Sequence, residues 1–165
     1  MTAEAEQRKA RPRRAKRWTA EEFDIALRDQ ADDEAVAISQ RIRGWATERG
    51  LKLTWGSGSI TGTYYPKLDH AGRIYPTFAV YTDSRIEINF RDIADANIEA
   101  DTVTVRHQIA VQLGAVRGEP FPDEQLKTWA YMPLLALSSD AALCEFLATW
   151  DWYIDLVTHP AQPDS

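Results

Sequence analysis

The sequence predicts an α+β protein: two N-terminal helices, an antiparallel meander of three to four strands, and two or more C-terminal helices packing on the sheet. Apolar residues recur at helical spacing before residue 50, alternate with polar residues over roughly 51–90, and return to helical spacing after residue 103. Helices that precede and follow an antiparallel sheet are typical of an α+β sandwich.

Charge and apolar content divide the chain into three parts. Residues 1–17 lack large apolar side chains after Met1 and predict a disordered basic arm. We expect a single α+β domain over 18–158 and a disordered tail over 159–165.

Strong start signals mark the first two helices. Thr19 and Glu22 form a capping-box pattern, with Trp18 and Phe23 at the positions of a hydrophobic staple. This helix is expected to run to about residue 31, and the acidic run at 32–34 is expected to open a second helix that ends near Gly50.

The strands follow from alternation and turn residues. A first run covers 51–55, and Asp69-His70-Ala71-Gly72 predicts a hairpin turn. In the returning strand Ile74, Pro76, Phe78 and Val80 are expected to share one face, which leaves Tyr75, Thr77 and Tyr81 on the other. A further strand alternates apolar residues with Arg85, Glu87 and Asn89.

Two later helices complete the pattern. One is expected over 103–113, ended by Gly114, and the last begins at Ser138 or Ser139 and runs to about Val157. Residues 124–137 are compatible with a helical turn followed by extended chain. We expect the third and last helices to cover the Tyr75/Tyr81/Glu87 face of the sheet; the alternative is an exposed face whose tyrosines stack on unpaired bases.

Composition excludes several classes of protein. The only cysteine, Cys144, forbids an internal disulfide, and on an amphipathic helix it is expected to be a small buried apolar residue. The three histidines do not have the spacing of a zinc site, so we expect no metal and no cofactor. No apolar run reaches membrane-span length and no signal-peptide pattern follows the N-terminus, which predicts a cytoplasmic protein without membrane contact.

The formal charge of −6 hides a strong asymmetry. Residues 1–17 hold seven basic residues against two Glu, a formal +5, which leaves −11 for residues 18–165. Clustered cations bind phosphates with little sequence preference. Our first hypothesis is therefore a non-catalytic module that binds DNA or RNA through Arg8, Lys9, Arg11, Arg13, Arg14, Lys16 and Arg17.

A second hypothesis rests on a partial resemblance over about 34–91. A helix, a hairpin and then a strand bearing Glu87-Ile88-Asn89 resemble the restriction-endonuclease-like fold. The resemblance implies a divergent metal-dependent nuclease in which Asp69 and Glu87 hold a divalent ion, with Asn89 where that family usually has Lys.

A wider resemblance spans about 18–157. Trp18-Thr19-x-Glu21-x-Phe23, Leu51-x-Leu53-x-Trp55-Gly56, Ile86-Glu87-Ile88-x-Phe90 and Phe146-Leu147-x-x-x-Asp151-Trp152 are similar to a group of small bacterial domains of unknown function. This resemblance implies a shared fold and no catalytic residues.

The third hypothesis is a protein-interaction or homodimerisation domain. Trp129, Trp152 or the sheet edge are candidates for its contact surface. Trp150 and Trp152 lie about 200° apart around a helix and cannot both face one core.

Overall fold

The computed structural model describes residues 16–97 and 102–159 and has the α+β fold that the sequence predicts. Over these residues, two helices precede a six-stranded antiparallel sheet and the remaining helices follow most of its strands. The fold class is therefore confirmed, whereas the sheet is larger than the expected three to four strands.

Five α-helices and two short 3-10 helices occur in the described ranges. The helices are α3 (Ala20–Gln30), α4 (Asp33–Glu48), α5 (Phe90–Ala96), α6 (Thr102–Arg117), η1 (Asp123–Lys127), η2 (Leu134–Leu137) and α7 (Asp140–Thr158). The strands are β1 (Lys52–Trp55), β2 (Thr63–His70), β3 (Arg73–Pro76), β4 (Phe78–Tyr81), β5 (Arg85–Ile88) and β6 (Ala130–Pro133).

Helix starts agree closely with the sequence signals. Thr19 and Glu22 form the expected capping box, and Asp32 and Ser139 cap α4 and α7 through their side chains. The predicted end of α6 was wrong, because the helix continues through Gly114 to Arg117. A Cβ at Gly114 would lie 3.3 Å from Pro120 Cα, so this glycine permits a close approach of the following loop.

The helix α5 was not expected from the sequence. Asn89 caps it by accepting a hydrogen bond from the Asp92 backbone N–H, and its side-chain amide donates to Asp92 Oδ2. Phe90 and Ile93 bury its apolar side. Asn89 therefore ends the strand and begins a helix.

The sheet order is β1-β2-β4-β5-β6, with β3 pairing with β2 beyond the end of β4. His70 pairs with Arg73, so Ala71 and Gly72, both at positive φ, form the expected hairpin turn. Strand β6 adds to the edge at β5, opposite Glu87 and its neighbours, although more than forty residues separate the two strands.

A bend at Thr77 changes the expected faces of the returning strand. Thr77 is buried and its hydroxyl donates to the Pro66 carbonyl at 2.7 Å. Tyr75 pairs with Leu68 and packs against the core, whereas Ile74 lies opposite Asp69. The prediction that Tyr75 shares a face with Tyr81 was wrong, because the bend shifts the alternation by one residue.

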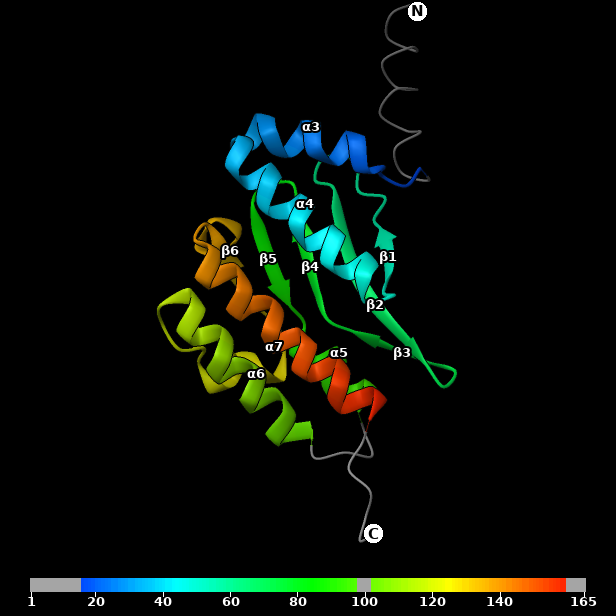
Figure 1. The fold of residues 1–165 in the computed structure, drawn as a ribbon, viewed down its shortest axis with the longest axis vertical. Helices are drawn as coiled ribbons and strands as arrows, with labels where there is room; N and C mark the ends of the chain where they lie inside the picture. Colours follow the sequence, from blue (N-terminus) through cyan, green and yellow to red (C-terminus); the bar gives the residue numbers. More distant parts are fainter. Residues whose placement is uncertain (1–15, 98–101, 160–165) are drawn as a thin grey trace, which may run out of the picture.

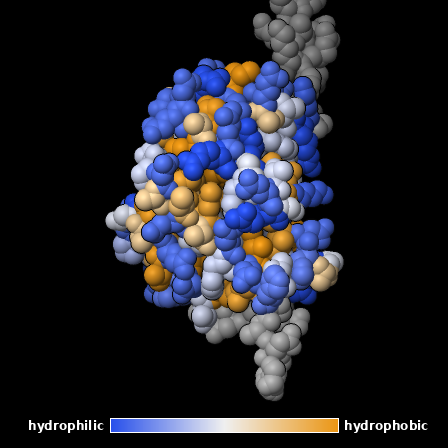
Figure 2. Space-filling view, in the orientation of Figure 1, coloured by the Kyte–Doolittle hydropathy of each residue, from blue (hydrophilic) through white to orange (hydrophobic). Residues whose placement is uncertain are grey.

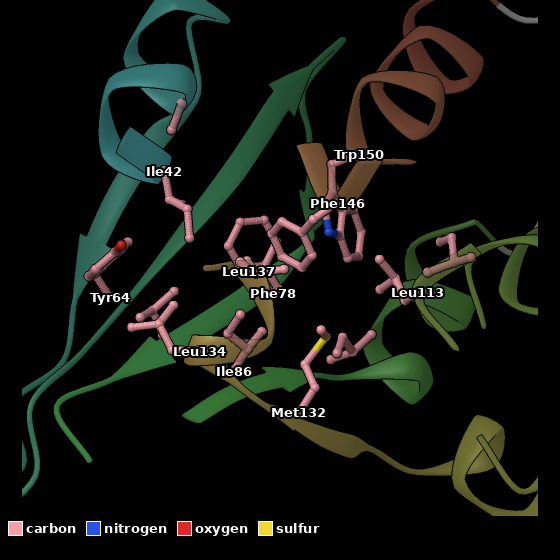
Figure 3. Close-up of a cluster of buried hydrophobic side chains, with 14 of the residues drawn as sticks. Ile42, Tyr64, Phe78, Ile86, Leu113, Met132, Leu134, Leu137, Phe146 and Trp150 are labelled. Carbon is pink, nitrogen blue, oxygen red and sulfur yellow. The ribbon is translucent and has the colours of Figure 1, made fainter. Parts of the chain in front are cut away.

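Among the described residues, the four long helices α3, α4, α6 and α7 lie on one side of the sheet (Figure 1). Phe78, Ile86 and Met132 extend from the strands toward Ile42 of α4, Leu113 of α6, and Phe146 and Trp150 of α7 (Figure 3). These residues belong to one continuous core that reaches from Trp18 to Tyr153.

The expectation that helices cover the second sheet face was wrong. Residues on that face alternate with the buried ones and remain partly exposed in β2 and β5. Because the long helices of the described ranges pack on the other side, none of them covers this second surface, here called the uncovered face.

The helix-bearing side is mostly hydrophilic, with hydrophobic residues in separate patches (Figure 2). Cys144 of α7 is exposed, contrary to the prediction. Leu143 and Phe146 face the core, and Cys144 lies on the outer side of the same helix. No helix within the described ranges has the length and apolar character that crossing a bilayer requires.

Candidate functional site

The uncovered face is hollowed where β2, β4 and β5 lie next to α5. Ala79, Glu87 and Tyr131 lie in one row across β4, β5 and β6, because Ala79 pairs with Glu87 and Glu87 pairs with Tyr131. Tyr65 continues this row on β2, one residue beyond the pair of Tyr64 with Val80. Ala79 contributes only a methyl group between larger neighbours. The result is a hollow of about 570 Å³, here called the hollow, whose lining includes Tyr65, Lys67, Ala79, Tyr81, Glu87 and Asp95. This volume is in the range of small-ligand sites.

Glu87 and Tyr81 form one wall of the hollow. The Tyr81 hydroxyl donates a hydrogen bond of 3.1 Å to Glu87 Oε1. Partial burial and the neighbouring carboxylate raise the pKa of Tyr81 to about 12. The same two causes raise the pKa of Tyr131 above its usual value. Both phenols therefore remain hydrogen-bond donors throughout the neutral range.

Arg85 lies between two tyrosine rings beside this wall. Its Cζ is 4.5 Å from the ring centroid of Tyr81 and 4.7 Å from that of Tyr131. Its Nε donates to both carboxylate oxygens of Asp83, at 3.0 and 2.9 Å. The uncovered face thus already holds one guanidinium between aromatic rings and against a carboxylate.

The opposite wall and the end of the hollow come from β2 and α5. Lys67 Nζ lies 4.8 Å from the ring centroid of Tyr65. Asp92 and Asp95 of α5 line the end. Ionised carboxylates only accept hydrogen bonds, whereas the ammonium only donates them. Three carboxylates and one ammonium give the lining a formal charge of −2.

The two carboxylates of the nuclease hypothesis are not brought together. Asp69 lies four residues beyond Tyr65 on β2, whereas Glu87 is level with Tyr65 two strands away. Their Cα atoms are therefore roughly 16 Å apart, at about 4.8 Å per strand and about 3.3 Å per residue. Asn89 caps α5 instead of facing Asp69. The described ranges contain no group of three or more His, Cys, Asp or Glu suited to a metal ion.

Of the predicted nucleic-acid-binding residues, Lys16 and Arg17 lie within the described ranges. Arg8, Lys9, Arg11, Arg13 and Arg14 lie outside the described residues. Lys16 and Arg17 are both exposed next to the start of α3. Lys16 is 3.5 Å from Glu22, and Arg17 donates to the Trp55 carbonyl at 2.6 Å. These two cations lie at the helix α3 end of the molecule, away from α5.

The tryptophans proposed for an interface differ from each other. Trp129 is 45 % exposed and directly precedes β6, whereas Trp152 is partly buried and packs against the core. Trp150 is fully buried, as the helical geometry requires of one member of the pair. Ile74 and Tyr131 add exposed apolar area to the uncovered face.

Sequence reasoning identified Tyr81 and Glu87 as members of one face but missed Tyr65, Tyr131 and Asp95. Tyr131 could not be assigned because β6 joins the sheet from a distant part of the chain. The pattern Asn89-x-x-Asp92 followed by buried Ile93 was a local signal for α5, and it would have placed Asp95 near the sheet end.

No family model matches this chain, and no curated protein or solved structure shows significant similarity to it. The site is therefore interpreted from its own chemistry.

Proposed function

We propose that this protein is a non-catalytic nucleic-acid-binding module whose phosphate contacts come from residues 8–17. The observation that carries the proposal is the division of charge: +5 on residues 1–17 and −11 on the rest of the chain. An acidic body repels a phosphate backbone, so attraction has to come from the basic segment.

The exposure of Lys16 and Arg17 supports this proposal. Lys16 is 58 % exposed, and its partner Glu22 holds it only through a surface contact at 3.5 Å. Surface ion pairs are worth about 1 kcal/mol or less. Lys16 is therefore available to phosphates at little cost.

Salt dependence of binding tests the proposal in the full-length chain. The Arg11, Arg13, Arg14→Gln triple variant removes three positive charges from the segment. Binding of fluorescein-labelled 20-nucleotide single strands and duplexes is measured by anisotropy between 20 and 200 mM salt. The slope of log K against log salt is negative, and each lost phosphate contact reduces its magnitude by about 0.7 to 0.9, so we expect the magnitude to decrease by about 2 to 3.

A matched control removes three cations from residues 18–165. Arg41, Lys52 and Lys127 are exposed and lie outside the segment. The Arg41, Lys52, Lys127→Gln variant has the same total charge as the segment variant, and we expect its slope to stay near that of the unaltered chain. Equal slopes in all three proteins, or no binding at the lowest salt concentration, would refute the proposal.

A further inference from the structure

The hollow has the size and lining of a site for a planar organic cation. Tyr65 on β2 forms one side and Glu87 on β5 forms the other. The Cα atoms of these two residues lie roughly 10 Å apart, because two strand spacings separate them. Ala79 lies between them, and its small methyl group leaves the floor of the hollow unfilled. A flat group can therefore enter between the Tyr65 side and the Glu87 side.

The charge of the lining determines whether the hollow attracts cations or anions. Glu87, Asp92 and Asp95 outnumber Lys67, and the whole region 18–165 has a formal charge of −11. Both local and long-range fields therefore attract cations and repel phosphates. Carboxylate acceptors at one side and tyrosine rings beside them are the groups that bind a guanidinium, through bidentate hydrogen bonds and stacking.

Arg85 provides an example of the same chemistry on this face. Its guanidinium stacks at 4.5 and 4.7 Å from two tyrosine ring centroids while Asp83 accepts from its Nε. Tyr81 is shared, because it lines the hollow and contacts Arg85. A second guanidinium in the hollow would contact the carboxylates of Glu87 and Asp95 in the way that Arg85 contacts the carboxylate of Asp83.

We propose that the hollow binds the guanidinium of an arginine side chain presented by a partner polypeptide. This site goes beyond the nucleic-acid contact proposed for residues 8–17, since it uses a different surface and the opposite charge. Glu87 and Asp95 accept hydrogen bonds from the guanidinium, which lies beside Tyr65 and Tyr81 of the lining.

The experiment uses the full-length chain labelled with a fluorophore at the exposed Cys144, which lies on the helix-bearing side of the molecule. The probe is the peptide acetyl-Gly-Gly-Arg-Gly-Gly-amide, titrated by thermophoresis beside analogues with citrulline or lysine in place of arginine. We expect the citrulline peptide, which lacks the charge, to bind at least tenfold more weakly than the arginine peptide. The lysine peptide should also bind more weakly, because an ammonium lacks the planar fork.

Variants locate the binding in the hollow. Glu87→Gln keeps an acceptor for Tyr81 but removes the charge, and we expect a tenfold or greater loss of affinity. Ala79→Leu fills the floor and is expected to abolish binding. Glu48→Gln, an exposed carboxylate on α4, is the matched control and is expected to bind as the unaltered chain does. Circular dichroism melting shows that each variant is folded, and Asp95→Asn replaces Ala79→Leu if the latter does not fold.

Two comparisons separate the ligand sources. The Arg11, Arg13, Arg14→Gln chain should bind the peptide with unchanged affinity; tighter binding would show that the chain's own segment competes for the hollow and would overturn the assignment to a partner. Arginine and citrulline peptides that bind equally, Glu87→Gln binding that is unaffected, or oligonucleotide binding that Glu87→Gln abolishes would each overturn the proposal.

Discussion

The Tyr81 hydroxyl donates a hydrogen bond of 3.1 Å to the Glu87 carboxylate on the uncovered face of the sheet. The two residues lie on neighbouring strands, and both line the hollow. Tyr81 can donate this bond only while it is protonated. Ionisation would place two negative charges side by side, so the pair couples the protonation of Tyr81 to the charge of Glu87.

The first prediction is that Glu87→Gln lowers the pKa of Tyr81 from about 12 toward its usual value. Partial burial remains in the variant, but the charge of the carboxylate is lost. The measurement is an NMR titration of the tyrosine Cζ resonances between pH 8 and 13. Glu48→Gln, remote on α4, should leave the Tyr81 titration unchanged. A Tyr81 titration that is identical with and without Glu87 would contradict the role given to this contact.

The second prediction concerns stability in alkali. Burial raises the pKa of Tyr153 to about 12, and burial also raises the pKa of the fully buried Tyr64. A pKa that is higher in the folded state means that the folded protein binds the proton more tightly than the unfolded chain. The stabilisation is fully present below pH 10, the pKa of an unfolded tyrosine, and is lost as the pH rises through about 12.

Urea unfolding at pH 8, 9, 10 and 11 measures this effect. We expect the free energy of unfolding to fall between pH 9 and 11, and to fall less steeply in Tyr153→Phe, which has no phenol to ionise. The variant also loses the hydrogen bond from Asn97 to the Tyr153 hydroxyl, at 2.8 Å, so its stability at pH 8 is lower. The prediction is therefore tested by the slope of the free energy of unfolding against pH, not by its value at pH 8. Parallel slopes for the two proteins would refute this prediction.

The third prediction compares a largely buried ion pair with an exposed one. Arg43 and Asp24 form two hydrogen bonds of 2.9 Å, and their side chains are only 14 % and 15 % exposed. Removing one partner of such a pair leaves an uncompensated charge, so we expect Asp24→Asn to lower the free energy of unfolding by about 3 kcal/mol.

Double-mutant cycles on two pairs provide the control. Arg28 and Asp33 approach to 2.7 Å, closer than the buried pair, but their side chains are 51 % and 87 % exposed. We expect a coupling energy below about 1 kcal/mol for this surface pair and a larger one for Arg43 and Asp24. Equal coupling energies would mean that burial does not determine the strength of these contacts.

The sequence predicted those parts of the fold that local signals determine. Thr19 and Glu22 marked the start of α3, and Asp69 to Gly72 marked the β2–β3 hairpin. Capping and turn formation involve residues within four positions of each other, so a linear pattern contains the necessary information.

The rest of the fold depended on contacts between distant residues. The bend at Thr77 is held by a bond to Pro66, and it reversed the predicted face of Tyr75. Alternating polarity is compatible with a covered face and with an open one, so the pattern around Glu87 could not decide between them. Tyr131, which lies beside Arg85 and opposite Glu87, comes from β6, and the pairing of β6 with β5 joins residues more than forty positions apart.

The last prediction concerns the loop that joins β1 to β2. A Cβ placed on Gly62 would lie 2.6 Å from Trp18 Cδ2, well inside van der Waals contact. Trp18 cannot easily move away, because its side chain is buried and its Nε1 donates to the Gly58 carbonyl at 2.7 Å. Overpacking of this kind costs about 1–3 kcal/mol, so we expect Gly62→Ala to lower the free energy of unfolding by that amount.

Gly44→Ala is the matched control, since the same methyl group is added where no atom lies within 4 Å. Gly44 is exposed in the interior of α4, where alanine has the higher helix propensity, so this variant should be more stable by about 0.5–1 kcal/mol. The same glycine-to-alanine change should thus lower the free energy of unfolding at Gly62 and raise it at Gly44. This difference separates the contact with Trp18 from the general effect of replacing glycine. The two free energies come from urea unfolding at pH 7, and a Gly62→Ala protein as stable as the unaltered chain would show that the Trp18 ring is free to shift.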